Sequence, residues 1–156
     1  MDHIEFTTPY MQSIPTSPTT VFDRDGEDKK HSIKLNSYMD VIKFLMFTRD
    51  TAQILHWATY KFSIHVAMGE LYDGLEEMID DLAEMMLGSV ETMDFASADT
   101  VSYQLSKQPS EFIATVRSVM IDSAHLFVSE PSLKNKFDEI VGLINKTKYK
   151  IDRLVS

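Results

Sequence analysis

The chain has 156 residues, of which 44% are hydrophobic and 25% are charged, a composition that suits one globular domain with a single core. It contains no cysteine, which excludes disulfides, thiolate metal sites and cysteine nucleophiles. Its formal net charge of -9 argues against sequence-independent DNA binding, because that affinity depends on Lys and Arg neutralising phosphates.

The first 35 residues predict an extended or mobile arm. They hold Pro9, Pro15 and Pro18 together with many Ser and Thr, and they show no sustained helical or strand period. A short strand near Val21 and Phe22 is the regular element that this arm suggests. Residues 36–156 are predicted to form the folded domain.

A helical apolar pattern begins near residue 38. Ser37 and Asp40 form a capping-box-like pair at its start. The pattern persists to residue 87, and one helix of that length would extend about 75 Å, too far for a small domain. A break is therefore required, and the β-branched and aromatic residues between Thr59 and Ser63 predict it there.

The break divides the pattern into helices over residues 38–58 and 64–87. Ser63 is the expected N-cap of the second helix, and Gly88 is its expected C-cap. Because the turn between the two helices is short, they should pack antiparallel as a hairpin.

The rest of the chain predicts a second hairpin. Residues 89–108 form a crossover segment, with a short helix expected near 97–105. A third helix is expected over about 109–128, and a fourth begins at Ser129-Glu130-Pro131 and runs almost to the C-terminus. Two hairpins joined by one longer crossover are typical of ferritin-like folds, so we predict an all-α, antiparallel four-helix bundle of the ferritin-like kind.

The second predicted helix is strongly acidic. No Lys or Arg occurs between Phe62 and Ser106, and the simplest interpretation is a solvated helix face. On a helical wheel, however, His65, Asp80 and Glu84 share one flank. His65 and Asp80 are separated by about 22 Å along the helix axis, so a joint metal site would need two antiparallel copies across a twofold axis.

The stretch Leu55-His56-Trp57, the following His65 and the segment from residue 69 to 84 resemble the core signature of Dps-type miniferritins. In that family, histidines and an Asp and Glu four residues apart form an iron-oxidising site between subunits. The resemblance covers residues 38–87 and implies a metal site for iron. Imidazole and carboxylate ligands would also suit Zn or Mn. The resemblance also implies a homo-oligomer, at least a dimer and up to a dodecameric shell. The residues that it assigns to the metal are His56, His65, Asp80 and Glu84.

Two features of the same segment favour an alternative. Gly69 stands where the family has a carboxylate, and the link between His56 and His65 is shorter than in the family pattern. The alternative is a non-catalytic helical scaffold or interaction protein, of a kind that phages encode, which retains the bundle but has lost the ferroxidase site. Whether the protein oxidises iron is therefore left open. A hydrolase with paired carboxylates is a weaker third candidate, because no phosphate loop or nucleophile motif is present.

Partners are predicted from charge and from one aromatic residue. The fourth predicted helix is basic and complements the acidic second helix within an assembly. The arm is net acidic, so we expect DNA binding to be weak or absent. Trp57 is expected to pack at a subunit interface.

The sequence shows neither an apolar run that could span a membrane nor a secretory leader, and the predicted location is the cytoplasm.

Overall fold

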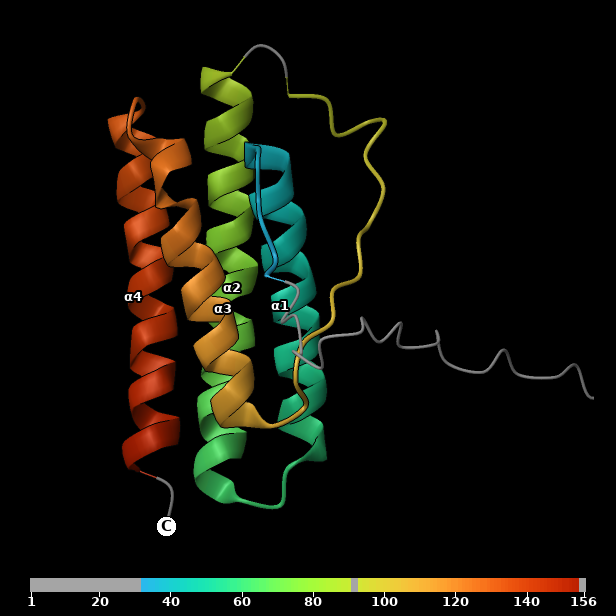
Figure 1. Ribbon diagram of the computed structural model, residues 1–156, viewed down its shortest axis with the longest axis vertical. Helices are drawn as coiled ribbons and strands as arrows, with labels where there is room; N and C mark the ends of the chain where they lie inside the picture. Colours follow the sequence, from blue (N-terminus) through green and yellow to red (C-terminus); the bar gives the residue numbers. More distant parts are fainter. Residues whose placement is uncertain (1–31, 91–92, 155–156) are drawn as a thin grey trace, which may run out of the picture. The chain divides into compact units, whose positions relative to one another are not determined.

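A computed structural model describes residues 32–90 and 93–154, and within these ranges the protein contains helices and no strand. The helices lie side by side around one core (Figure 1). They are α1 (Tyr38–Ala58), α2 (Phe62–Ser89), α3 (Pro109–Ser123), the short 3-10 helix η1 (Ala124–Phe127) and α4 (Pro131–Arg153). This confirms the predicted all-α class with four long helices. The strand predicted near Val21 and Phe22 lies outside the described residues.

The start of α1 agrees with the capping pair that the sequence predicts. The Ser37 hydroxyl accepts the backbone N–H of Asp40 at 3.1 Å, and the Asp40 carboxylate accepts the N–H of Asn36 at 2.8 Å. Both side chains thus satisfy backbone donors that no helical carbonyl can reach. Just before this cap, Leu35 is buried in the core.

The chain turns between α1 and α2 over residues 59–61, inside the predicted break. The hydroxyl of Thr59 accepts the N–H of Lys61 at 3.2 Å, so the turn satisfies one of its own backbone donors. α2 therefore begins at Phe62, and the expected N-cap role of Ser63 is wrong. The N-cap is Lys61, which makes no side-chain capping bond.

The end of α2 also differs from the prediction. The helix continues past Gly88 to Ser89, whose hydroxyl donates to the carbonyl of Met85 one turn earlier. The N–H of Val90 then donates to the carbonyl of Met86 at 2.8 Å. These bonds close the last turn without a glycine cap, so the C-cap predicted at Gly88 is wrong.

The crossover segment is not helical within residues 93–108, so the short helix predicted near 97–105 is wrong. The carboxylate of Asp94 accepts the hydroxyl of Ser97 at 2.6 Å and the N–H of Ala96 at 3.0 Å. The bond from the Ser97 hydroxyl, and next the bond from the Ala96 N–H, hold the pKa of the Asp94 carboxyl below its usual value. Such local bonds offer the backbone an alternative to helical hydrogen bonding, which explains the turn here.

Tyr103 anchors the crossover to α1. Its ring packs edge-on against Phe44 and Phe47, with centroid distances of 5.2 and 5.6 Å. Burial, and then the negative charge of Asp40, raise the pKa of Tyr103 above its ordinary value of 10.0. The packing therefore favours the neutral phenol.

We expect this contact to weaken at alkaline pH. With the folded pKa raised, the unfolded chain loses the Tyr103 proton first, so the free energy of unfolding should fall as pH rises above about 10. Urea unfolding on both sides of that pH should show a smaller decline for Tyr103→Phe than for the unaltered protein. Tyr149→Phe, a change at an exposed position, is the control, and equal declines in both variants would contradict the assignment.

The third predicted helix is divided in two. α3 ends at Ser123, and η1 continues to Phe127, where one helix to about residue 128 was expected. The buried Ser123 hydroxyl donates to the carbonyl of Val119 at 2.7 Å, a bond that often bends a helix. α4 begins at Pro131, within the predicted Ser129-Glu130-Pro131 start, and its N-cap is Glu130.

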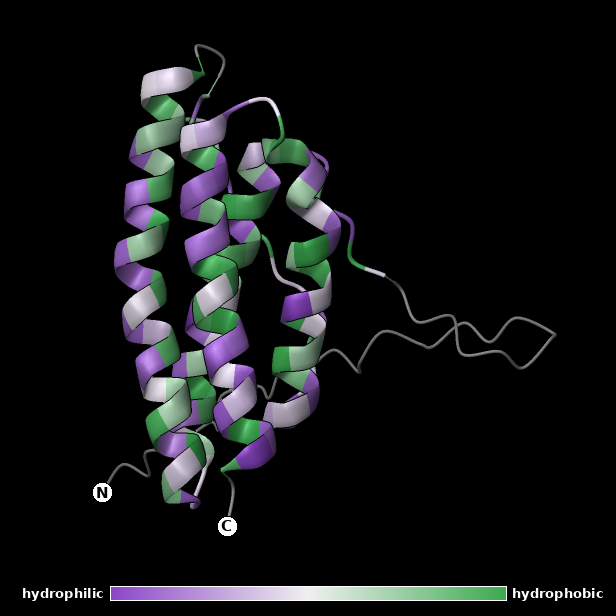
Figure 2. Ribbon diagram, turned by 90° about the vertical axis from the view of Figure 1, so that its left-hand side faces the viewer, coloured by the Kyte–Doolittle hydropathy of each residue, from purple (hydrophilic) through white to green (hydrophobic). Residues whose placement is uncertain are grey.

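The core is formed by the faces that the helices turn toward one another. α2 contacts both α1 and α4, and α4 also contacts α3. Hydrophilic and hydrophobic residues alternate along each helix, as expected for helices with one buried face (Figure 2). None of the described helices combines the length and apolar character that a membrane span requires. The largest fully buried side chains are Phe44, Phe112, Phe127, Phe137, Leu45, Met68, Leu71, Leu75, Leu82, Met86, Ile113 and Met120.

Candidate functional site

His56 of α1 and His65 of α2 meet beside the turn that joins the two helices. Their rings are stacked, with centroids 3.7 Å apart and an interplanar angle of 24°. Nδ1 of His56 donates to the backbone carbonyl of His65 at 2.7 Å, and Nδ1 of His65 donates to the carbonyl of His56 at 2.9 Å. The two side chains thus form a reciprocal pair that closes the hairpin.

This pairing decides where each ring carries its proton. A carbonyl oxygen can only accept, so both rings carry a proton on Nδ1, and a neutral ring then has a free electron pair on Nε2. Metal-binding histidines commonly have this form, with one nitrogen on the metal and the other N–H held by a carbonyl or carboxylate. The His56–His65 pair is therefore chemically suited to offer two Nε2 ligands.

Local structure explains why these two residues meet. The carbonyl of His56 lies in the last turn of α1, where helical carbonyls lack a partner within the helix, and the His65 ring supplies one. A Cβ atom added at Gly69 would lie 3.1 Å from two atoms of the His56 ring. Tyr72 packs edge-on against the same ring at 5.3 Å. Gly69 of α2, at the position where the miniferritin pattern has a carboxylate, thus leaves room for the ring of His56 from α1.

Asp80 and Glu84 lie elsewhere on α2. Both are exposed, and they are one turn apart on the outward face of the helix. Asp80 is about 22 Å from His65 along the axis of α2, as the sequence predicts. The structure brings the two histidines together, but the two acids lie far from them along α2. Within residues 32–90 and 93–154, no group of three or more His, Asp or Glu side chains is placed to hold a metal ion.

The acidic residues of α2 are partly neutralised within the chain. Lys136 of α4 donates to Asp81 at 3.2 Å, and Lys150 forms an ion pair with Glu70. Hydrogen bonds from Lys136 to Glu139 first, and then to Asp81, raise the pKa of this lysine. The basic and the acidic helix thus form ion pairs within one chain, whereas the sequence led us to expect this match within an assembly.

Four acidic residues of α2 form no ion pair with any other residue that the structure describes. Glu76 is excluded from this group because Arg49 of α1 lies 3.5 Å from it. The remaining four are exposed and share the outward face of the helix. We call this group the acidic face: Asp73, Glu77, Asp80 and Glu84.

Aromatic side chains gather at the turn beside the histidine pair. Trp57 is 69% exposed, and Tyr60 and Phe62 are more exposed still. The interface role expected for Trp57 stays a prediction, but its exposure is what such a role requires. Tyr60 and Phe62 were not identified from the sequence as surface residues. Their position in and beside a three-residue turn was a signal, because so short a turn cannot bury two aromatic rings.

Comparison with known proteins identifies a family for this chain. Residues 56–151 match the model of a family of unknown function (DUF5856), and the match spans more than half of the chain, which therefore belongs to that family. No curated protein and no solved structure matches the chain significantly. All four predicted metal ligands lie within the matched segment. The resemblance to Dps-type miniferritins stays a prediction.

Proposed function

We propose that this member of a family without assigned function is a ferritin-like protein that binds a divalent cation, Fe(II) in the first place, between two copies. His56 and His65 of one copy and Asp80 and Glu84 of the other are the proposed ligands. The observation that carries the proposal is the reciprocal histidine pair, because its hydrogen bonds leave both Nε2 atoms free to bind a metal.

The ferritin-like, antiparallel arrangement of the helices is part of this proposal. Contacts between α2 and its neighbours support an antiparallel arrangement. As the residue numbers increase along α2, those of the contacting residues on α1 and on α4 decrease. These contacts are Gly69 with His56, Glu76 with Arg49, Glu70 with Lys150 and Asp81 with Lys136.

The proposed ligands fit the chemistry of Fe(II), Zn and Mn, since imidazole nitrogen and carboxylate oxygen suit all three. They can meet only across two copies, because within one chain His65 and the two acids lie too far apart along α2. An antiparallel second α2 would bring Asp80 and Glu84 to His65, and it would place Asp73 close to its own symmetry mate. Like charges at that axis oppose association, so the dimer should form only when a cation is bound.

Anaerobic titration with Fe(II), followed by analytical ultracentrifugation, tests this proposal. We expect saturation near one ion per chain, a doubling of the mass on metal binding, and return to the monomer with chelator. Asp80→Asn combined with Glu84→Gln should abolish both effects while keeping the shape of the side chains. Asp73→Asn combined with Glu77→Gln removes two charges from the same acidic face and should retain metal binding, and it should dimerise at least as readily because the repulsion at the axis is reduced. Unchanged binding in the first variant, or a dimer without metal, would refute the proposal.

We propose metal binding at this site without two-iron oxidation. A two-iron oxidation site would require a further carboxylate near His65, and Gly69 occupies that position. The His56 ring lies against Gly69, so a carboxylate introduced there would displace the ring that supplies a ligand.

A second candidate is the non-catalytic scaffold, and the same packing favours it. The stacked rings, the two Nδ1–H bonds and the close approach to Gly69 are together sufficient to close the hairpin without a metal. In that case the histidines would stabilise the monomer, and the Fe(II) titration would show no saturation.

A further inference from the structure

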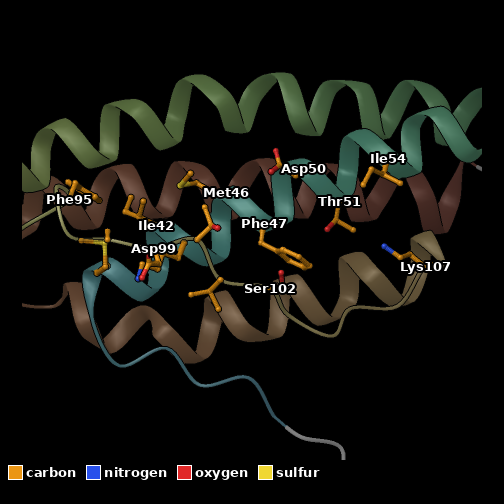
Figure 3. Close-up of a pocket in the computed structure, with 15 residues that line it drawn as sticks. Ile42, Met46, Phe47, Asp50, Thr51, Ile54, Phe95, Asp99, Ser102 and Lys107 are labelled. Carbon is orange, nitrogen blue, oxygen red and sulfur yellow. The ribbon is translucent and has the colours of Figure 1, made fainter. Parts of the chain in front are cut away.

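A cavity of about 490 Å³ lies between the outer face of α1 and the crossover segment (Figure 3). Its volume falls within the range of sites that bind small molecules, about 300–1,000 Å³. It shares no residue with the proposed metal site. Most of its lining is apolar and includes Ile42, Met46, Phe47 and Ile54 of α1 and Phe95 and Val101 of the crossover.

The cavity also carries positive charge. Lys43 and Lys107 line it, and neither forms an ion pair with any residue in the described part of the chain. Of the two acidic residues in the lining, Asp50 is held by Arg49 at 2.6 Å, and Asp99 alone is left to balance the lysines. The charge available to a ligand is thus mainly cationic.

The positions of these side chains suggest how a ligand would lie. Figure 3 shows the Lys107 amine pointing from the crossover toward Phe47 and Thr51, and Met46 lies further along α1 from it. Met46 and Ile54 are 44% and 49% exposed, so an apolar chain laid over them would remove further apolar surface from water. Methionine adapts to ligands of varied shape, which suits a flexible chain.

We propose that this cavity binds a small amphipathic anion, a molecule with a flexible apolar chain and one terminal carboxylate. The chain lies along Met46, Phe47 and Ile54, and the carboxylate pairs with Lys107. A neutral apolar ligand would leave the lysine unpaired, and a cationic one would meet a second positive charge.

Fluorescence titration of the full chain with dansyl-labelled undecanoic acid tests the proposal. We expect saturable binding with a blue shift of the dansyl emission. The methyl ester of the same probe should bind about fivefold more weakly, because it lacks the charge that pairs with Lys107. A dansyl-labelled amine of the same length should bind more weakly than the ester. Absence of saturation, or equal affinity for acid and ester, would overturn the proposal.

Matched variants separate the two parts of the site. Ile54→Asn should reduce the affinity at least tenfold, whereas Ile121→Asn, which alters the same residue type at 43% exposure on α3, should not change it. Lys107→Gln should weaken binding of the acid about fivefold and leave the ester unaffected, and Lys61→Gln outside the cavity should alter neither. Equal loss in the two isoleucine variants would overturn the site, as would self-association through this face in place of probe binding.

Discussion

Phe137→Ala should lower the free energy of unfolding by about 3–5 kcal/mol, the range for removing a fully buried phenylalanine ring. Phe137 is 1% exposed, and its ring stacks on Phe127 with centroids 4.4 Å apart. Phe127 in turn contacts Tyr38 at 5.1 Å. The Phe137 ring therefore supports η1 directly and the beginning of α1 through Phe127, and its loss should leave a cavity beside Phe127.

Urea unfolding followed by circular dichroism measures this effect. Tyr149→Ala is the control, because Tyr149 lies on the same helix but is 58% exposed, so its loss should cost less than about 0.5 kcal/mol. If the two variants lost similar stability, Phe137 would not occupy the centre of the core. A fall in the denaturant slope as well as in the midpoint would indicate that the unfolded state had changed too.

The boundaries of α1 were predictable because their signals are local. The Ser37–Asp40 pair starts the helix, and Thr59, which is β-branched and bonds within the turn, ends it. The ends of α2 and α3 were less predictable, because serine hydroxyls decide them. Ser89 bonds back to a carbonyl and extends α2 past Gly88, while Ser123 makes the same type of bond where α3 gives way to a 3-10 turn. The sequence alone does not show whether a serine hydroxyl will bond to the carbonyl one turn earlier and extend or bend the helix.

The candidate site shows the same division between pattern and packing. The hairpin after residue 58 follows from periodicity and length, whereas only the resemblance to miniferritins assigned His56 and His65 to one site. Their stacking depends on the register of α1 on α2 and on the missing Cβ of Gly69, which only the structure reveals. The cavity was not predicted either, because one of its walls is an extended crossover in which a helix was expected.

His56→Ala and His65→Ala should each lower the free energy of unfolding by about 2–3 kcal/mol in the presence of a chelator. Each change removes one Nδ1–H bond and the ring stacking, and the His65 change also leaves the carbonyl of His56 without its side-chain partner at the end of α1. Chelator excludes any contribution from bound metal, so the loss reports the hairpin alone. Urea unfolding of the purified protein in chelator gives the measurement.

The histidine pair should also show energetic coupling. In a double-mutant cycle, the loss in the double variant should be smaller than the sum of the single losses by about 1–2 kcal/mol, because each change already removes the shared stacking. His125→Ala is the matched control, since the His125 ring is exposed and bonds only to the carbonyl of Asp122 within its own segment, at 2.8 Å. Its loss should cost less than about 1 kcal/mol. Additive losses at His56 and His65 would contradict the reciprocal pairing.

The same variants separate the two candidate functions when Fe(II) replaces the chelator. If the pair serves only the hairpin, metal should add no stability to the unaltered protein, and the variants should differ from it equally with and without Fe(II). If the pair also binds metal, Fe(II) should stabilise the unaltered protein by an amount that grows with its concentration, because ligand binds the folded state alone. His65→Ala should lose this increment entirely. Asp80→Asn with Glu84→Gln should lose it too while keeping its full stability in chelator. Loss of the metal-dependent doubling of mass in the same variant would then show that the acids act from the second copy.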